Sequence, residues 1–162
     1  AKKFNSLDQV TPSNMPKWLN QVDRAILKWD KNYSDEFARI AIFIIFVWFG
    51  FLKVIGVSPA AGLVEMLLVE TLPFIPFDVF FPAFGVFEMI VGIIFLVPKW
   101  TRVAILILFL HMITTFLPII FLPEIAWQSF GVLTLEGQYI VKNVAIVTLA
   151  MALGLTIKPM KR

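Results

Sequence analysis

The sequence predicts an all-α integral membrane protein built as a bundle of four transmembrane helices. Its 162 residues are 59% hydrophobic and only 15% charged, against about 25% charged in a typical soluble domain. A soluble domain of this length cannot hide so much apolar surface from water. Because a spanning helix needs about 20 apolar residues, the length leaves room for roughly four or five spans and no separate soluble domain. An N-terminal amphipathic interfacial helix and a short extracytoplasmic helix between spans one and two complete the prediction.

Residues 1–36 are predicted to form a cytoplasmic tail followed by the amphipathic helix. From Pro16 to Asn32, the apolar residues Trp18, Val22 and Trp29 recur at helical spacing, and charged residues occupy much of the remaining surface. This pattern is typical of a helix lying in the membrane interface. A cytoplasmic helix packed on a partner subunit is the alternative interpretation.

The first span is expected from Phe37 to Val57, with Lys53 inside it. Ser58 and the proline after it predict the start of a second helix that ends near Leu72. That helix has about 14 residues and a length of about 21 Å, which is too short to cross a bilayer. We therefore expect it to lie on the membrane surface or to re-enter the bilayer.

Three further spans follow, each with a polar residue in an apolar run. The second contains Glu88, and the third contains His111. Trp100 lies in the short basic turn between them and, with Trp18 and Trp29, is expected to anchor the protein at the interface. The spans are predicted at Val79–Val97, at Val103–Leu122, and from Thr134 or Tyr139 to Ile157, with a loop over Pro123–Leu133. The transmembrane domain is thus predicted over residues 37–157, and a basic cytoplasmic end follows at 158–162.

The basic residues indicate the orientation in the membrane. Four spans place both termini and the turn before the third span on one side, and that side collects 12 of the 14 lysines and arginines. Lys53 and Lys142 are the exceptions. Under the positive-inside rule, both termini are cytoplasmic in a plasma membrane, here interpreted as a bacterial inner membrane.

Charged residues inside the predicted spans are the first candidates for function, because a charge in a bilayer costs at least about 2.5–3.5 kcal/mol. Helix rise places Lys53, Glu88 and Lys142 at overlapping depths. Glu136 and Asn143 share one face of the fourth span, and we assign them to the same buried polar cluster. The cluster is either a pocket that handles a quinone headgroup or protons, or a set of ion pairs, Lys53 with Glu88 and Lys142 with Glu136, that orients helices.

His111, Thr114 and Thr115 form a second polar stripe on the third span. Imidazole can exchange a proton near neutral pH, but a single buried histidine is more often an interhelical hydrogen-bonding group. The chain has no cysteine, which excludes disulfides, thiol chemistry and cysteine-ligated iron–sulfur clusters. We expect no metal, no nucleic acid and no cofactor held by this chain itself, unless quinone or lipid enters the polar cluster. No catalytic residue is identified.

Three segments together resemble the DoxX-like family of small four-helix membrane proteins, including its branch linked to reactive-chlorine stress. The first combines Arg39-Ile-Ala with Trp48-Phe-Gly-Phe-Leu-Lys53. The second is Gly85-Val-Phe-Glu88-Met-Ile-Val-Gly92, and the third runs from Leu133 to Asn143 with Lys142 inside it. The Thr114-Thr115-Phe run and the later Pro123-Glu-Ile-Ala-Trp127 resemble the chlorine-stress branch.

The resemblance implies a four-helix bundle with both termini inside, and it marks Lys53, Glu88 and Lys142 as family-like positions. The family takes its name from a small subunit of an archaeal thiosulfate:quinone oxidoreductase. The leading hypothesis is accordingly a small accessory subunit of a larger membrane complex, respiratory or redox and linked to quinone, which is not catalytic alone. The alternatives are a homo-oligomeric small-molecule transporter or export partner, and a structural membrane anchor or assembly factor.

Overall fold

The computed structural model describes residues 16–157. The chain divides into two units, residues 1–35 and residues 36–162. The predicted tail before Pro16 and the basic end at 158–162 lie outside the described residues. The described part of the first unit is helical from Lys17 onward, as the amphipathic pattern predicts. There Trp18 and Trp29 expose more than half of their surface.

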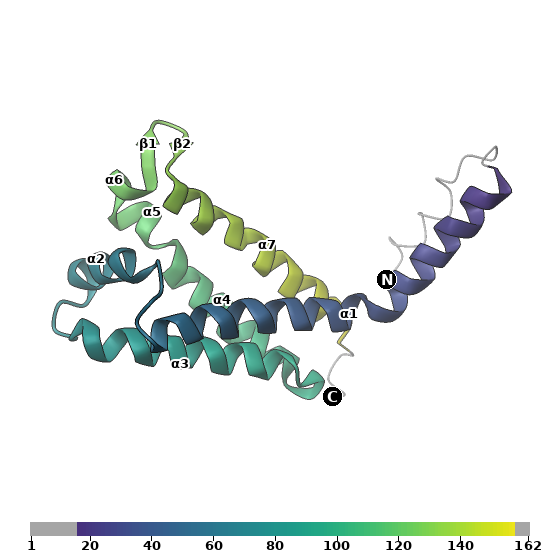
Figure 1. Cartoon of the computed structure of the whole chain (residues 1–162), viewed down its shortest axis with the longest axis horizontal. Helices are drawn as coiled ribbons and strands as arrows, with labels where there is room; N and C mark the ends of the chain where they lie inside the picture. The colour runs from purple at the N-terminus through teal and green to yellow at the C-terminus, as the bar shows by residue number, and fades with distance from the viewer. Residues whose placement is uncertain (1–15, 158–162) are drawn as a thin grey trace, which may run out of the picture. The chain divides into compact units, whose positions relative to one another are not determined.

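Four helical segments are long and apolar enough to cross a membrane, which confirms the predicted number of spans among the described residues. They indicate a helical membrane protein in contact with the lipid bilayer. Figure 1 shows the later three as the long helices labelled α3, α4 and α7. The first segment is Tyr33–Val54 within α1 (Lys17–Val54), the second is α3 (Phe77–Phe95), and the fourth is α7 (Leu135–Leu155). The third, Pro98–Phe121, consists of a 3-10 turn (Pro98–Trp100), α4 (Thr101–Phe116) and α5 (Pro118–Phe121).

A short helix and a hairpin join the spans at one end of the second unit (Figure 1). Helix α2 (Ala61–Thr71) follows the first span and is too short to cross, as expected. It begins two residues after Pro59, and the Ser58 hydroxyl accepts a hydrogen bond from the amide of Ala60.

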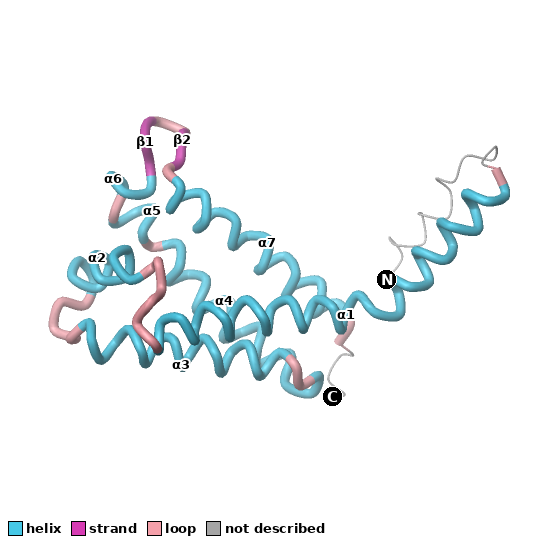
Figure 2. Tube along the Cα trace, in the orientation of Figure 1, coloured by secondary structure: helices cyan, strands magenta, loops and turns pink. Residues whose placement is uncertain are grey.

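The predicted loop over Pro123–Leu133 is instead a helical turn and an antiparallel hairpin, the magenta segment of Figure 2. Trp127 pairs with Leu133 across the hairpin, and Gly131 takes the positive φ of its turn. The loop prediction was wrong because the local sequence does not reveal the contact between Thr134 and the start of this segment. In that contact the Thr134 hydroxyl donates a hydrogen bond to the Ile125 carbonyl. The elements are α6 (Pro123–Ala126), β1 (Trp127–Ser129) and β2 (Val132–Leu133).

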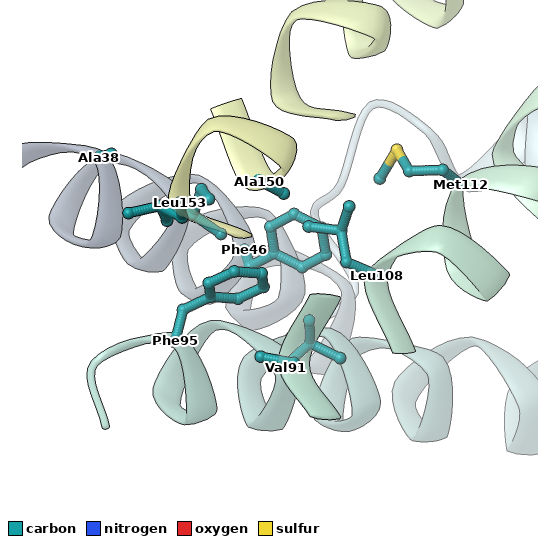
Figure 3. Packing of buried hydrophobic residues seen from close by; sticks show 10 residues of the cluster. Ala38, Phe46, Val91, Phe95, Leu108, Met112, Ala150 and Leu153 are labelled. Atoms are coloured by element: carbon teal, nitrogen blue, oxygen red, sulfur yellow. The ribbon is translucent and has the colours of Figure 1, made fainter. Parts of the chain in front are cut away.

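The core of the second unit lies among its four long helices (Figure 3). Phe95 and Leu108 are completely buried there. Lipid tails are as apolar as these side chains, so close packing holds the helices together more than escape from water does. The labelled members of the core are Ala38, Phe46, Val91, Phe95, Leu108, Met112, Ala150 and Leu153.

Arg39 joins the first span to the turn between α3 and α4. Its guanidinium donates to the Phe95 carbonyl at 3.0 Å and to the Thr101 hydroxyl at 2.6 Å. That hydroxyl donates in turn to the Pro98 carbonyl at 2.7 Å. The arginine therefore satisfies a carbonyl that the end of α3 leaves without a helical partner.

Candidate functional site

A buried ion pair between α1 and α3 forms the centre of the candidate site. The Nζ atom of Lys53 lies 2.6 Å from Oε2 of Glu88. Both residues are less than one-tenth exposed. The predicted pairing of these two residues is confirmed, and their charges balance each other within the bundle.

Two glycines allow α1 and α3 to approach closely enough for this pair. A Cβ atom built on Gly85 would lie 2.5 Å from the Gly50 carbonyl oxygen, and one built on Gly50 would lie 2.5 Å from the Gly85 oxygen. No real side chain tolerates that distance, so both positions require glycine. Each glycine precedes its charged residue by three positions, which places glycine and charge on the same helix face. The Gly-x-x-Lys and Gly-x-x-Glu spacings thus supply both the close contact and the pair.

His111 on α4 is the third member of the site. Its Nε2 atom lies 3.6 Å from Oε1 of Glu88, which is too long for a hydrogen bond. The ring packs among the rings of Phe46, Phe84 and Phe87 at centroid distances of 5.3–5.7 Å. Its Nδ1 atom is buried and has no hydrogen-bond partner among the described residues. The sequence placed His111 in a separate stripe, whereas the structure brings it beside Glu88.

Thr114 and Thr115 turn their hydroxyls back to their own helix. Both donate to the carbonyl of His111, at 2.7 Å and 3.1 Å. Their side chains still line the pocket described below. They therefore add no free donor to it, and each hydroxyl oxygen remains able to accept a hydrogen bond.

The part of the predicted cluster that lies on α7 does not join the site. Lys142 is exposed, and its Nζ atom lies 5.0 Å from the ring centroid of Tyr139. Glu136 is exposed and Asn143 is half-buried. Within residues 16–157, neither Glu136 nor Glu88 forms an ion pair with Lys142.

Helix rotation explains the difference. Ile140 is the residue of α7 that lines the pocket. Lys142 follows two residues later, which is about 200° around the helix and therefore on a different face. The number of residues along the helix gives the level of Lys142 on the helix axis. It does not give the direction in which the side chain points. Thr134 caps the start of this helix, since its hydroxyl accepts from the Gly137 amide at 3.1 Å.

A cavity of about 470 Å³ opens beside Lys53, Glu88 and His111. Its size lies within the range of about 300–1,000 Å³ typical of small-molecule sites. Helix α2 forms one wall of this cavity, which the sequence did not predict. Apart from the three central residues the lining is almost wholly apolar, and it comprises Ala60, Leu63, Val64, Leu67, Leu68, Thr71, Leu72, Phe80, Phe84, Phe87, Leu110, Thr114, Thr115, Leu117, Pro118 and Ile140.

No family model, curated protein or solved structure matches the chain. The site must therefore be interpreted from its own chemistry. In the part of the chain that the structure describes, no group of three or more histidine, aspartate or glutamate side chains is placed to hold a metal ion. The central residues offer hydrogen-bond donors and acceptors instead.

The predicted interfacial tryptophans are exposed. Trp18 and Trp29 belong to the first unit, and Trp29 packs against Tyr33 with ring centroids 5.8 Å apart. In the second unit, Trp100 is about half exposed, and the Nζ atom of Lys99 lies 5.7 Å from its ring. These positions fit the expected anchoring role, which stays a prediction.

Proposed function

We propose that this chain is a small integral subunit of a quinone-linked membrane complex, and that its cavity binds the quinone. The observation that carries the proposal is a mostly apolar cavity whose charged side chains are those of one buried ion pair, Lys53 and Glu88. Such a cavity suits a molecule with an apolar body and a compact polar head. The DoxX-like resemblance supports the proposal, because Lys53 and Glu88 are two of the three positions that carry it.

The hydrogen-bonding capacity of the site favours a head with carbonyl or hydroxyl groups. Lys53 has three N–H donors, and one of them is used by Glu88. A ligand carbonyl can accept from another. Oε1 of Glu88 and Nδ1 of His111, which has no hydrogen-bond partner among residues 16–157, offer further capacity to a quinol hydroxyl or a bound water. Because the Lys53 and Glu88 charges cancel, an uncharged head binds without leaving a net charge in the bilayer.

We further propose a plasma membrane location with both termini in the cytoplasm. The distribution of the basic residues supports this orientation, because the four spans leave Lys53 and Lys142 as the exceptions to a single basic side. The chain supplies the quinone site, and other subunits supply the electron carriers. The direct ion pair also favours a second function, the fixing of helix positions alone, and the experiment below separates the two.

Photolabelling tests the quinone site. The purified chain in mild detergent is irradiated with an azidoquinone, with and without excess decylubiquinone, and the labelled peptides are mapped by mass spectrometry. We expect label on α3 and α4 around Glu88 that decylubiquinone removes. Glu88→Gln should weaken binding about tenfold or more, because Lys53 loses the carboxylate that orients its remaining donors toward the quinone carbonyl, and a hydrogen bond to a charged group is worth about 1.5–3 kcal/mol. Glu136→Gln is the matched control, because that carboxylate is exposed and outside the cavity.

A structural role alone predicts a different result. In that case the wild-type cavity takes no competable label, and Glu88→Gln lowers stability without changing binding. If Glu88→Gln does not fold, the Val64→Trp variant distinguishes the two functions, because it places a large side chain in the cavity from α2 and leaves both residues of the ion pair unchanged. Unchanged labelling of that variant would rule out the cavity as the binding site.

A further inference from the structure

Helix α7 combines two properties that conflict for a span surrounded by lipid. It has the smallest share of buried residues, 17% of its most apolar window against 28% in each of the other spans. It also has the lowest mean hydropathy of the four. A surface facing hydrocarbon should be the most apolar, because polar groups are costly there. The exposed residues of α7 include Gln138, Lys142 and Thr148, so its exposed face is poorly suited to lipid.

Lys142 shows this conflict most clearly. It lies seven residues after the first residue of α7, about 10 Å along the helix. Its side chain is exposed, and the Tyr139 ring is its partner within residues 16–157. A cation–π contact at an exposed site is worth about 0.5–1 kcal/mol, which is less than the cost of about 2.5–3.5 kcal/mol for a charge deep in a bilayer. The Tyr139 contact by itself does not offset that cost.

We propose that the exposed face of α7 docks a transmembrane helix of a different polypeptide, which places a carboxylate opposite Lys142. Ala145 and Ala152 are exposed along the same helix, and small side chains let helices in lipid approach closely. This inference rests on the proposed role as a subunit of a complex, but it does not depend on what the cavity binds.

A second copy of this chain is a poorer occupant than a different polypeptide. A two-fold axis normal to the membrane would bring both Lys142 side chains to the same depth at the interface. The charges would then repel instead of pairing. Glu136 is six residues away, about 9 Å along the helix, and does not lie at the level of Lys142.

Site-specific crosslinking in the native membrane tests the proposal. The photoreactive residue p-benzoylphenylalanine replaces Ala145, and in a control chain it replaces Leu106, which is 61% exposed on α4. We expect a discrete protein adduct from position 145 and none from position 106. The crosslinked peptide should come from a transmembrane segment that carries Asp or Glu. Lys142→Glu should reduce the adduct at least tenfold, and exchange of the partner's carboxylate for lysine should restore it.

The other outcomes overturn the proposal. An adduct of twice the chain's mass identifies a second copy as the occupant. Equal lipid adducts from both positions mean that Lys142 extends toward the membrane surface beside Tyr139. A partner adduct that Lys142→Glu leaves unchanged means that the charge plays no part; if that variant does not fold, Lys142→Gln replaces it. Azidoquinone labelling of the same membranes reports separately on the cavity, so failure of the docking surface is distinguishable from failure of the quinone site.

Discussion

Loss of either charge of the Lys53–Glu88 pair should destabilise the bundle more than loss of both. Opposite unit charges 2.6 Å apart attract each other by about 6 kcal/mol at an effective dielectric constant of about 20. Removing both ions from water costs several kcal/mol per ion and offsets much of that attraction. Removing one partner leaves the other charge buried without compensation, at a typical cost of about 3–5 kcal/mol.

The assay is a double-mutant cycle on the free energy of unfolding, measured by reversible denaturation in mixed SDS micelles. The variants are Lys53→Met, Glu88→Leu and the two combined. Each single variant should lose about 3–5 kcal/mol, while the double variant should lose less than either. Lys142→Met is the matched control, because its side chain is exposed and makes no ion pair within the described residues. In the isolated chain its unfolding free energy should change by about 0.5 kcal/mol or less, because the side chain faces detergent in both the folded and the unfolded state.

Additivity would refute this reasoning. If the double variant loses the sum of the two single losses, the charges are not coupled and the 2.6 Å contact does not stabilise the fold. If neither single variant changes the unfolding free energy, both charges are solvated in the membrane-embedded protein.

Two further substitutions probe the contacts that position the site. Gly85→Ala should lower the unfolding free energy by about 1–3 kcal/mol, because its Cβ would meet the Gly50 carbonyl. Gly62→Ala is the control: a Cβ there meets nothing within 4 Å, so the unfolding free energy should be unchanged or slightly raised. An equal loss in both glycine variants would contradict the close approach. Arg39→Leu should lower the unfolding free energy by about 1.5–3 kcal/mol in the same assay, since the Thr101 hydroxyl and the Phe95 carbonyl lose a charged donor. An unfolding free energy equal to that of the wild type would show that water replaces the guanidinium.

Part of the site could be predicted because its determinants are local. Glycine and charge three residues apart on one helix lie on one face whatever the rest of the chain does. Two helices with that pattern at similar depth can meet through their glycines, and Lys53 and Glu88 do so. The Thr134 cap was predictable for the same reason, since donor and acceptor are three residues apart.

The errors concern side-chain direction and contacts between distant segments. Lys142 lies at a suitable depth but points away from the cavity, and the rotation of α7 that decides this depends on packing along its whole length. His111 approaches Glu88 because α4 packs beside α3, which the polarity of its own helix does not encode. The role of α2 as a cavity wall was equally out of reach, because a short apolar helix looks the same whether it covers a cavity or lies on a membrane.

The sequence by itself determined the class of protein and its spans. Composition and the length of apolar runs are sums over neighbouring residues, and they need no knowledge of the fold. The tertiary structure alone decided which polar residues share a cavity and which face outward. That outcome depends on the rotation of each helix about its axis, which packing between residues far apart in the chain determines.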